Sequence, residues 1–396
     1  MSRGPDIRPR YPLRRRYLAC VASGPHTGPR ERRARRRRAT RHTVEMLPVR
    51  TTWNGHARFT ALLCVLACLT PWSAARDGTV PDPPRGDVRV VVFGDFNGPY
   101  GSVTYPAPVA RAVAAIIDVW RPDGVLLPGD LVAGQDRSLP IERFAAMWDA
   151  FDAAVAAPLR AARIPYVATM GNHDASNLRV ADGSFAFARE RDAAAGYWAR
   201  PEHRAGLDVV ADDGAPFTFA TRLGPLFVAA IDASGPVVDA DQRAWLSAAL
   251  GTEAAREASA RIVMGHLPLV GIAIGRDRQG EVVWEAASLR DLMLAHDVDL
   301  YVSGHQAAYY PGRWEGLELL FSGGVGGRRL RVGDAPARSA VTVVDVWLEP
   351  LTLRYTTFDP VGFEAYDATA LPARLDGYGG TLERSTRDGS CAASGC

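Results

Sequence analysis

Five side chains that can bind metal ions each stand directly after a glycine in this sequence. They are Asp95, Asp130, Asn172, His266 and His305. Intervals of 35 to 94 residues separate them, so only the folding of the chain can bring them together. A glycine beside such a residue permits a tight turn and leaves room next to the ligand. One such pair is common in turns, but five in this order predict a shared metal-binding site.

The residues in front of these five positions have the pattern of buried β-strands. Short apolar, largely β-branched runs end at each glycine, and alanine-rich stretches with helical periodicity follow. The expected strands are 88–93, 125–128, 166–170, 216–222, 225–231, 261–264, 299–303, 308–310, 316–321, 339–347 and 351–357. The expected helices are 106–120, 141–162, 239–250 and 284–296.

This alternation predicts one α/β (α+β) domain from about residue 86 to residue 360. Sheets of this class bind ligands at the carboxyl ends of their strands, which is where the five side chains stand. The remaining residues, 361–396, are expected to form a loose C-terminal tail.

The charges are divided unevenly along the chain. Every basic residue is arginine, since the sequence has no lysine. Residues 1–75 hold 16 Arg and three acidic residues, whereas the rest of the chain holds 30 Arg and 41 acidic residues. A body with an excess of acidic residues argues against DNA or RNA as a ligand, because nucleic-acid binding requires a positive surface.

Residues 46–75 contain the three parts of an export signal in order. Arg50 and Arg58 precede an apolar run at 59–69, and small residues follow at 73–75. The run is about 11 residues long and a bilayer span takes roughly 20, so no lasting membrane span is expected.

Cleavage near Ala75 would deliver the chain to the periplasm or the medium. Cys68 makes lipoprotein processing an alternative, but the residues in front of it match the lipoprotein pattern poorly. Residues 1–45, which are rich in arginine, are then either an extension from a mis-assigned start or a disordered basic leader.

The motif Gly-Asn-His-Asp at 171–174, with the four other glycine–polar pairs, resembles a known family. The resemblance is to the calcineurin-like metallophosphoesterases, which include purple acid phosphatases and bacterial phosphodiesterases, and it covers residues 88–327. It implies a β-sandwich of mixed sheets flanked by helices, with two metal ions at strand ends. It also implies hydrolysis of phosphate monoesters or diesters by a metal-bound hydroxide, with a small molecule or a lipid headgroup as the esterified group.

The resemblance assigns a role to each ligand. Asp130 would bridge two divalent ions of the Mn, Fe or Zn type, and Asp95 would bind one of them. Asn172, His266 and His305 would complete the shell of the other ion.

The resemblance also implies two catalytic residues beside the metals. His173 would act as general acid or phosphate clamp. Asp174 would orient the surroundings of His173.

Three positions depart from the family pattern. Asn97 and Ala307 stand where the family has histidines, and Ala133 stands where it has aspartate or, in purple acid phosphatases, tyrosine. The resemblance therefore implies one tight metal site and, around Asp95, one weak site with oxygen ligands only, to which Asn97 would offer its amide oxygen. Neighbours that could replace the missing ligands are Gln135, Asp136, Gln306, Tyr309 and Tyr310.

These departures leave two other interpretations open. The chain could be a degenerate member of the fold that binds a phosphorylated ligand or partner with little turnover, or it could be a surface interaction protein. Other nucleophile chemistry finds no support, because the sequence has neither a Gly-x-Ser-x-Gly elbow nor a glycine-rich phosphate loop with lysine.

The export signal leads to a prediction about the mature protein. Because the cleavage region ends at Ala75, the chain isolated from its own host should begin near Arg76. N-terminal sequencing measures this directly. Recovery of peptides from residues 1–45 in the mature protein would contradict it.

Overall fold

Two mixed β-sheets form the centre of the structure, a computed structural model that describes residues 79–325, 328–331 and 339–387. These residues belong to one compact unit, Ala75–Cys396. The predicted signal peptide at 46–75 and the leader at 1–45 lie outside the described residues. No helix in the described part of the chain has both the length and the apolar character that crossing a membrane requires.

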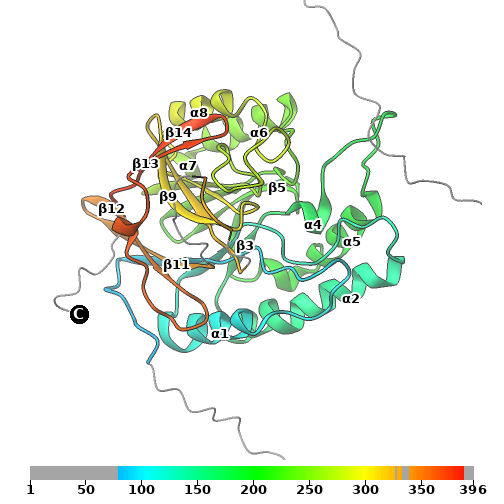
Figure 1. The fold of residues 1–396 in the computed structure, drawn as a ribbon, viewed down its shortest axis with the longest axis horizontal. Helices are drawn as coiled ribbons and strands as arrows, with labels where there is room; N and C mark the ends of the chain where they lie inside the picture. Colours follow the sequence, from blue (N-terminus) through cyan, green and yellow to red (C-terminus); the bar gives the residue numbers. More distant parts are fainter. Residues whose placement is uncertain (1–78, 326–327, 332–338, 388–396) are drawn as a thin grey trace, which may run out of the picture. The chain divides into compact units, whose positions relative to one another are not determined.

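The strand orders of the two sheets are β12-β11-β1-β2-β3 and β13-β14-β9-β10-β8-β7-β6-β5-β4 (Figure 1). The five-stranded sheet contains β1 (Val88–Val92), β2 (Gly124–Leu127), β3 (Tyr166–Ala168), β11 (Val341–Leu348) and β12 (Leu351–Phe358). The nine-stranded sheet contains β4 (Asp208–Gly214), β5 (Thr218–Leu223), β6 (Leu226–Ala230), β7 (Ala260–Met264), β8 (Leu300–Ser303), β9 (Tyr309–Trp314), β10 (Leu317–Ser322), β13 (Arg374–Gly377) and β14 (Gly380–Arg384).

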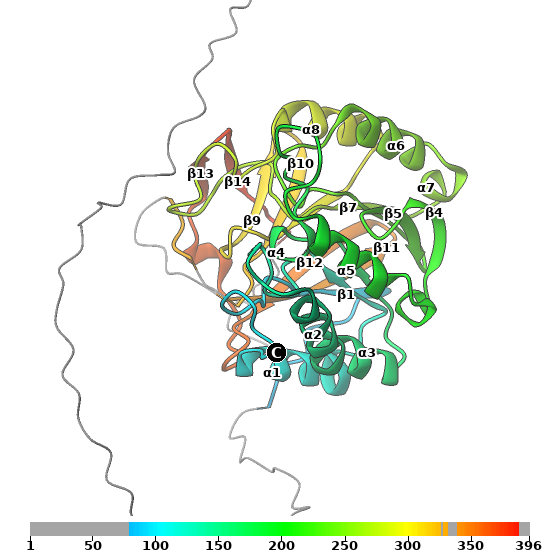
Figure 2. The same cartoon turned by 90° about the vertical axis from the view of Figure 1, so that its right-hand side faces the viewer.

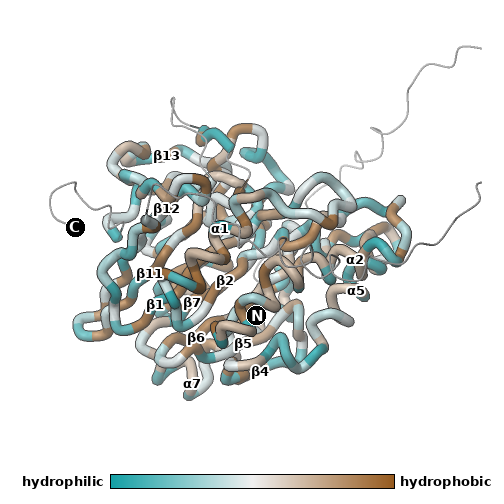
Figure 3. The backbone as a smooth tube through the Cα atoms, turned by 90° about the horizontal axis from the view of Figure 1, so that it is seen from below, coloured by the Kyte–Doolittle hydropathy of each residue, from teal (hydrophilic) through white to brown (hydrophobic). Residues whose placement is uncertain are grey.

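Strand β1 shows why the two sheets pack face to face. Val88, Val90 and Val92 lie in the core shared with the nine-stranded sheet, whereas Val91 packs into a second core on the helical side. Successive strand residues point to opposite faces, so a strand that is apolar on both faces must be covered on both. Figure 3 shows hydrophobic stretches in the central strands β2 and β7.

Helices cover the outer faces of the two sheets (Figure 2). The second core joins residues of α1, α2 and α5 to the five-stranded sheet, while α6 and α8 contact β6 and β10 of the nine-stranded sheet. The helices are α1 (Ala107–Ala115), α2 (Ile141–Phe151), α3 (Ala157–Ala161), α4 (Asn172–Ala175), α5 (Ala188–Trp198), α6 (Ala240–Leu250), α7 (Glu253–Arg256) and α8 (Ala286–Ala295). Mixed sheets flanked by helices confirm the predicted fold class.

The chain after residue 361 differs from the predicted loose tail. Strands β13 and β14 form a hairpin, and β14 pairs antiparallel with β9, where Glu383 lies opposite Arg313. The side chains of Leu375 and Leu382 are fully buried on the inner side of the hairpin. Two isolated leucines between polar residues make a weak strand pattern, which is why the sequence does not reveal this hairpin.

The five predicted metal-binding residues all follow parallel strands. Asp95, Asp130 and Asn172 come after β1, β2 and β3, which are parallel neighbours in one sheet. His266 and His305 come after β7 and β8, which are parallel neighbours in the other. The carboxyl ends of parallel strands meet at one edge of a sheet, so each sheet contributes one group of ligands.

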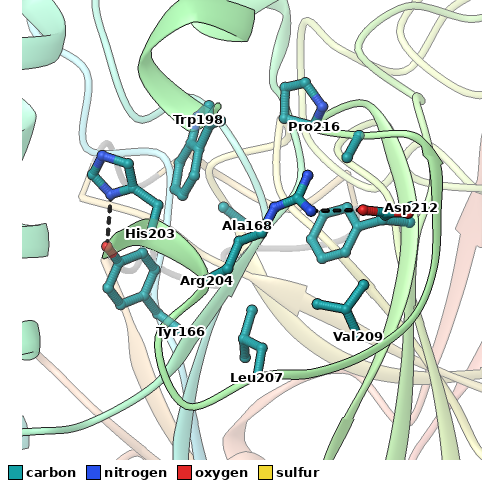
Figure 4. A pocket seen from close by; sticks show the side chains of 11 residues that line it. Tyr166, Ala168, Trp198, His203, Arg204, Leu207, Val209, Asp212 and Pro216 are labelled. Atoms are coloured by element: carbon teal, nitrogen blue, oxygen red, sulfur yellow. Dashed lines mark hydrogen bonds and ion pairs between the residues drawn. The ribbon is translucent and has the colours of Figure 1, made fainter. Parts of the chain in front are cut away.

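Figure 4 shows a small pocket that is lined by none of the five predicted metal-binding residues. The Nδ1 atom of His203 lies 2.9 Å from the Tyr166 hydroxyl and 3.3 Å from Nη1 of Arg160. Arg160 forms a two-point ion pair with Asp152. Burial, followed by the positive charge of Arg160, lowers the pKa of His203 to about 4.

This buried histidine predicts a loss of stability in mild acid. Unfolded His203 accepts a proton below about pH 6.5, whereas the folded form stays neutral down to about pH 4. The unfolded state therefore binds more protons in this window, and the free energy of unfolding falls as the pH drops from 6.5 to 4. Between pH 7 and pH 5 the His203 contribution should be about 2 kcal/mol.

Urea unfolding at the two pH values measures this contribution. His203→Gln should lose less stability than the unmodified protein between pH 7 and pH 5. His296→Gln, at a half-buried histidine that contacts Ser247, is the matched control. An equal loss in the unmodified protein and in His203→Gln would refute the assignment.

Candidate metal centre

Three buried side chains present donor atoms to one point at the edge where the strand ends meet. One donor atom each of Asp130, His266 and His305 lies within 4.8 Å of the other two. The amide oxygen of Asn172 lies among them, 3.0 Å from Nε2 of His266 and 2.8 Å from Nδ1 of His305. The structure thus brings together all four predicted ligands of the tight site.

The orientation of His266 is set by a backbone carbonyl. Its Nδ1 lies 2.8 Å from the oxygen of Pro128, and a carbonyl only accepts hydrogen bonds, so Nδ1 carries the proton. Nε2 faces Asp130, whose Oδ1 is 3.2 Å away, and it is the nitrogen that would bind a metal ion after losing its proton. Metal-binding histidines are held in this way, with the other ring nitrogen donating to a fixed acceptor.

The orientation of His305 is set by a carboxylate. Its Nε2 lies 2.8 Å from Oε2 of Glu281, which leaves Nδ1 facing the amide oxygen of Asn172. This hydrogen bond, together with the charges of His305 and Arg276, lowers the pKa of Glu281 to about 2 in spite of its partial burial. The pair therefore has the carboxylate–histidine arrangement that raises the basicity of a metal ligand.

Asn172 is oriented from its other end. Its Nδ2 donates to Oε1 of Gln135 at 2.7 Å, so its Oδ1 is the atom that faces the two histidines.

Burial alone would lower the pKa of His266, but the negative charge of Asp130 and the hydrogen bond between the two residues raise it to about 9. A metal ion between these two oxygens and two imidazole nitrogens would compensate the buried charge of Asp130, and the donor set fits Mn, Fe or Zn.

The Asp95 side of the centre is different. Oδ1 of Asp95 accepts the backbone N–H of His305 at 2.7 Å, and Oδ2 accepts the hydroxyl of Ser322 at 3.0 Å. Burial raises the pKa of Asp95 to about 6. Asn97 and Ala307, the positions of the missing histidines, line the cleft beside it. A hydrogen-bonded carboxylate beside an amide and an alanine does not fit a second tight site for such an ion.

The candidates for replacement ligands have other partners. Gln135 binds Asn172, and the side chain of Gln306 bonds the backbone of the loop at 272–281. Asp136 binds Ser138, Tyr310 donates to the carbonyl of Pro372, and Tyr309 packs against Tyr366. Ala133 lies in the helical core with its side chain buried.

The turns that carry the ligands have unusual backbone geometry. Asp95, Asp130, His305 and Ala307 all have positive φ, from 47° to 66°, which side chains other than glycine rarely adopt. Such strain persists where the surrounding structure enforces it, and it gathers at functional sites. The preceding glycines allow close approach: a Cβ at Gly171 would lie 2.2 Å from the backbone nitrogen of Asp130.

His173 lies beside the centre and faces solvent. Its backbone N–H donates to Oδ1 of Asp130 at 3.0 Å, and its ring stacks on Tyr100 with 5.3 Å between the centroids. Nδ1 lies 3.1 Å from the carbonyl of Gly134, so Nδ1 carries the proton and Nε2 is the free ring atom, 4.0 Å from Oδ2 of Asp130. This is the position that the sequence predicts for an acid or a phosphate clamp.

Asp174 is behind the site and lines neither of the clefts at the centre. Its carboxylate accepts the backbone N–H groups of Leu131, Val132 and Gly171 at 2.7–2.8 Å. Burial raises its pKa to about 7. Asp174 ties the turn after β2 to the turn after β3, which is a positioning role of the kind that the resemblance implies for this member of the predicted catalytic pair.

Two clefts of about 710 and 660 Å³ open onto the centre. Both are lined by Tyr100, His173, Arg276 and His305. The larger one extends to the exposed apolar side chains Leu178, Val237 and Trp284. The centre can therefore receive a charged group from one side and an apolar group from the other.

Sequence reasoning missed Arg276 and Glu281. Both lie in the long connection between β7 and α8, and Nη1 of Arg276 is 3.0 Å from Oε2 of Glu281. The connection has no strand or helix periodicity, and although Glu281 directly follows Gly280, no apolar strand pattern precedes that pair. Nothing in the sequence links them to His305, which follows 24 residues after Glu281.

Comparison with known proteins agrees with this geometry. Residues 88–309, more than half of the chain, match the calcineurin-like phosphoesterase family. The chain therefore belongs to that family, as the motifs predict. No curated protein matches the sequence.

Two solved structures illustrate the fold. A purple acid phosphatase, PPD1, from yellow lupin (Lupinus luteus) seeds is 18% identical with a TM-score of 0.50, and the match covers 73% of this chain. This chain spans only 54% of the lupin chain, so the likeness concerns the fold. A dimetal phosphatase from Danio rerio is 14% identical with a TM-score of 0.44, covering 68% of this chain and 95% of the other.

The contact between Glu281 and His305 predicts a measurable effect on metal affinity. Glu281→Ala removes the acceptor that orients the imidazole and should weaken metal binding about 10- to 100-fold. Asp277→Ala is the matched control, because Asp277 lies in the same connection but pairs with Arg331. Titration against a chelating dye gives both affinities. Equal affinities in Glu281→Ala and the unmodified protein would show that Glu281 does not support His305.

Proposed function

We propose that this protein is an exported, metal-dependent hydrolase of phosphate esters that uses one tightly bound divalent ion. The observation that carries the proposal is the buried convergence of Asp130, Asn172, His266 and His305, each oriented by a fixed partner, at the floor of a cleft. Family membership supports phosphate-ester chemistry at the level of the family.

The residues around this centre suit hydrolysis. A divalent ion bound there would supply an activated water molecule and would withdraw negative charge from the phosphoryl group. His173 has Nε2 directed at the same space, since Nδ1 is held by Gly134. When Nε2 also carries a proton, His173 can donate that proton to the leaving oxygen or hydrogen-bond a phosphoryl oxygen. Asp174 ties the turn after β2 to the turn after β3, and this fixes the spacing between His173 and Asp130.

The clefts support a small-molecule or lipid-headgroup ester as substrate. The wall formed by Leu178, Val237 and Trp284 suits the apolar part of such an ester. The acidic body of the chain argues against nucleic acid. A second candidate, a protein that binds a phosphorylated ligand with little turnover, is favoured by Asn97 and Ala307 at positions where the family has histidines.

Two histidine substitutions test the proposal. His266→Ala removes one imidazole from the tight shell and should abolish tight metal binding and hydrolysis together. His173→Ala should leave the metal content intact and lower turnover by roughly 10²- to 10⁴-fold, the usual value of general acid catalysis. Elemental analysis after dialysis gives the metal content, and p-nitrophenyl phosphate and bis-p-nitrophenyl phosphate report turnover.

His296→Ala is the control, because His296 contacts Ser247 outside the site. Loss of metal in His173→Ala as complete as in His266→Ala would overturn the assigned roles. A metal-loaded protein that hydrolyses neither ester would favour the binding protein.

A further inference from the structure

Two arginines face the side of the centre where the family pattern is incomplete. Arg276 and Arg328 line the same cleft as Asp95, Asn97 and Ala307. The family pattern would supply a second cation here, but the residues present do not fit one. The cleft therefore contains positive charge that is part of the protein itself, at the place where ligands for a metal are missing.

Arg276 is held firmly and keeps one side open to the cleft. Its Nη1 pairs with Oε2 of Glu281 at 3.0 Å and lies against the ring of His305, 2.8 Å from Nε2 and 3.1 Å from Nδ1. The side-chain amide of Gln306 donates to the backbone carbonyl of Arg276, and this hydrogen bond anchors the backbone of the residue. The side chain is 20% exposed, and it lines both clefts at the centre. A guanidinium in this position can still donate from its remaining N–H groups.

Arg328, an exposed residue, lines the same cleft. Its backbone N–H donates to the carbonyl of Ala307, so the residue is tied to the position where the family has its last histidine. Partial burial and the positive charge of Arg276 lower the pKa of Arg328, while Glu281 and Asp95 act in the other direction. Its guanidinium thus lies within electrostatic range of both Asp95 and Arg276.

We propose that Arg276 and Arg328 form a phosphoryl-binding subsite that takes the place of a second metal ion. The inference rests on the proposed function and names the residues that hold the anionic oxygens of its substrate. Guanidinium groups match phosphate oxygens with paired, charge-assisted hydrogen bonds and keep their charge at all physiological pH values. Glu281 holds the guanidinium of Arg276 in place before substrate arrives, and preorganised charge of this kind stabilises an anion most effectively.

The test measures binding of inorganic phosphate to the metal-loaded protein by isothermal titration calorimetry, with metal content determined in parallel. Arg328→Gln and Arg276→Gln should each weaken phosphate binding about tenfold or more, the effect of losing a hydrogen bond between charged groups. Arg328→Gln should retain the metal. Arg276→Gln could also disturb His305, so Arg328→Gln is the deciding variant.

Two neighbouring arginines are matched controls. Arg329→Gln alters the next residue along the chain, which does not line the cleft, and Arg278→Gln alters the outer partner of Glu281, whose side chain is 72% exposed. Both should bind phosphate within about twofold of the unmodified protein, as surface changes usually do.

The outcomes separate this inference from the proposed function. Unchanged phosphate affinity in Arg328→Gln and Arg276→Gln would overturn the subsite. Retention of two metal equivalents per chain after dialysis would overturn it as well. A protein that hydrolyses no ester but loses phosphate affinity in these variants would refute the proposed function and support the subsite.

Discussion

The carboxylate of Asp130 places a negative charge inside the protein, and the centre is organised around it. The residue is only 4% exposed, and its oxygens face His266 and the backbone N–H of His173. A buried charge is costly unless a counter-charge and hydrogen bonds compensate it. Pro128, Gln135 and Glu281 turn the neighbouring ligands toward the same point, so the whole arrangement is complete only with a cation there.

The sandwich is what allows this arrangement. Asp130 and Asn172 follow strands of one sheet and His266 and His305 follow strands of the other, so the donor set exists only where the two sheets meet. Apolar residues on the inner faces, such as those of β1 and β7, set the distance between the sheets. Packing in this core therefore controls the geometry of the ligands, and a change far from the centre can move one half of the shell against the other.

The sequence predicts those parts of the site that repeat a local pattern. Apolar runs that end in a glycine and a ligand mark five strand ends, and the structure brings four of these ligands to one point. Glu281 and Arg276 could not be predicted, because they lie in an irregular connection whose path depends on tertiary contacts such as those of Gln306. The resemblance implies an orienting role for Asp174, but its three backbone partners become visible only when two turns are placed together.

The two sides of the centre each need positive charge to bind a phosphoryl group, and they obtain it in different ways. On the His266 side, four oriented donors converge on one point where a metal ion could bind. On the Asp95 side, both carboxylate oxygens already accept hydrogen bonds, which reduces their capacity to bind a metal. Arginine stays protonated and cannot dissociate, whereas a weakly held ion exchanges with the medium. A cleft that combines one bound ion with built-in guanidinium groups would keep half of its positive charge when metal is scarce.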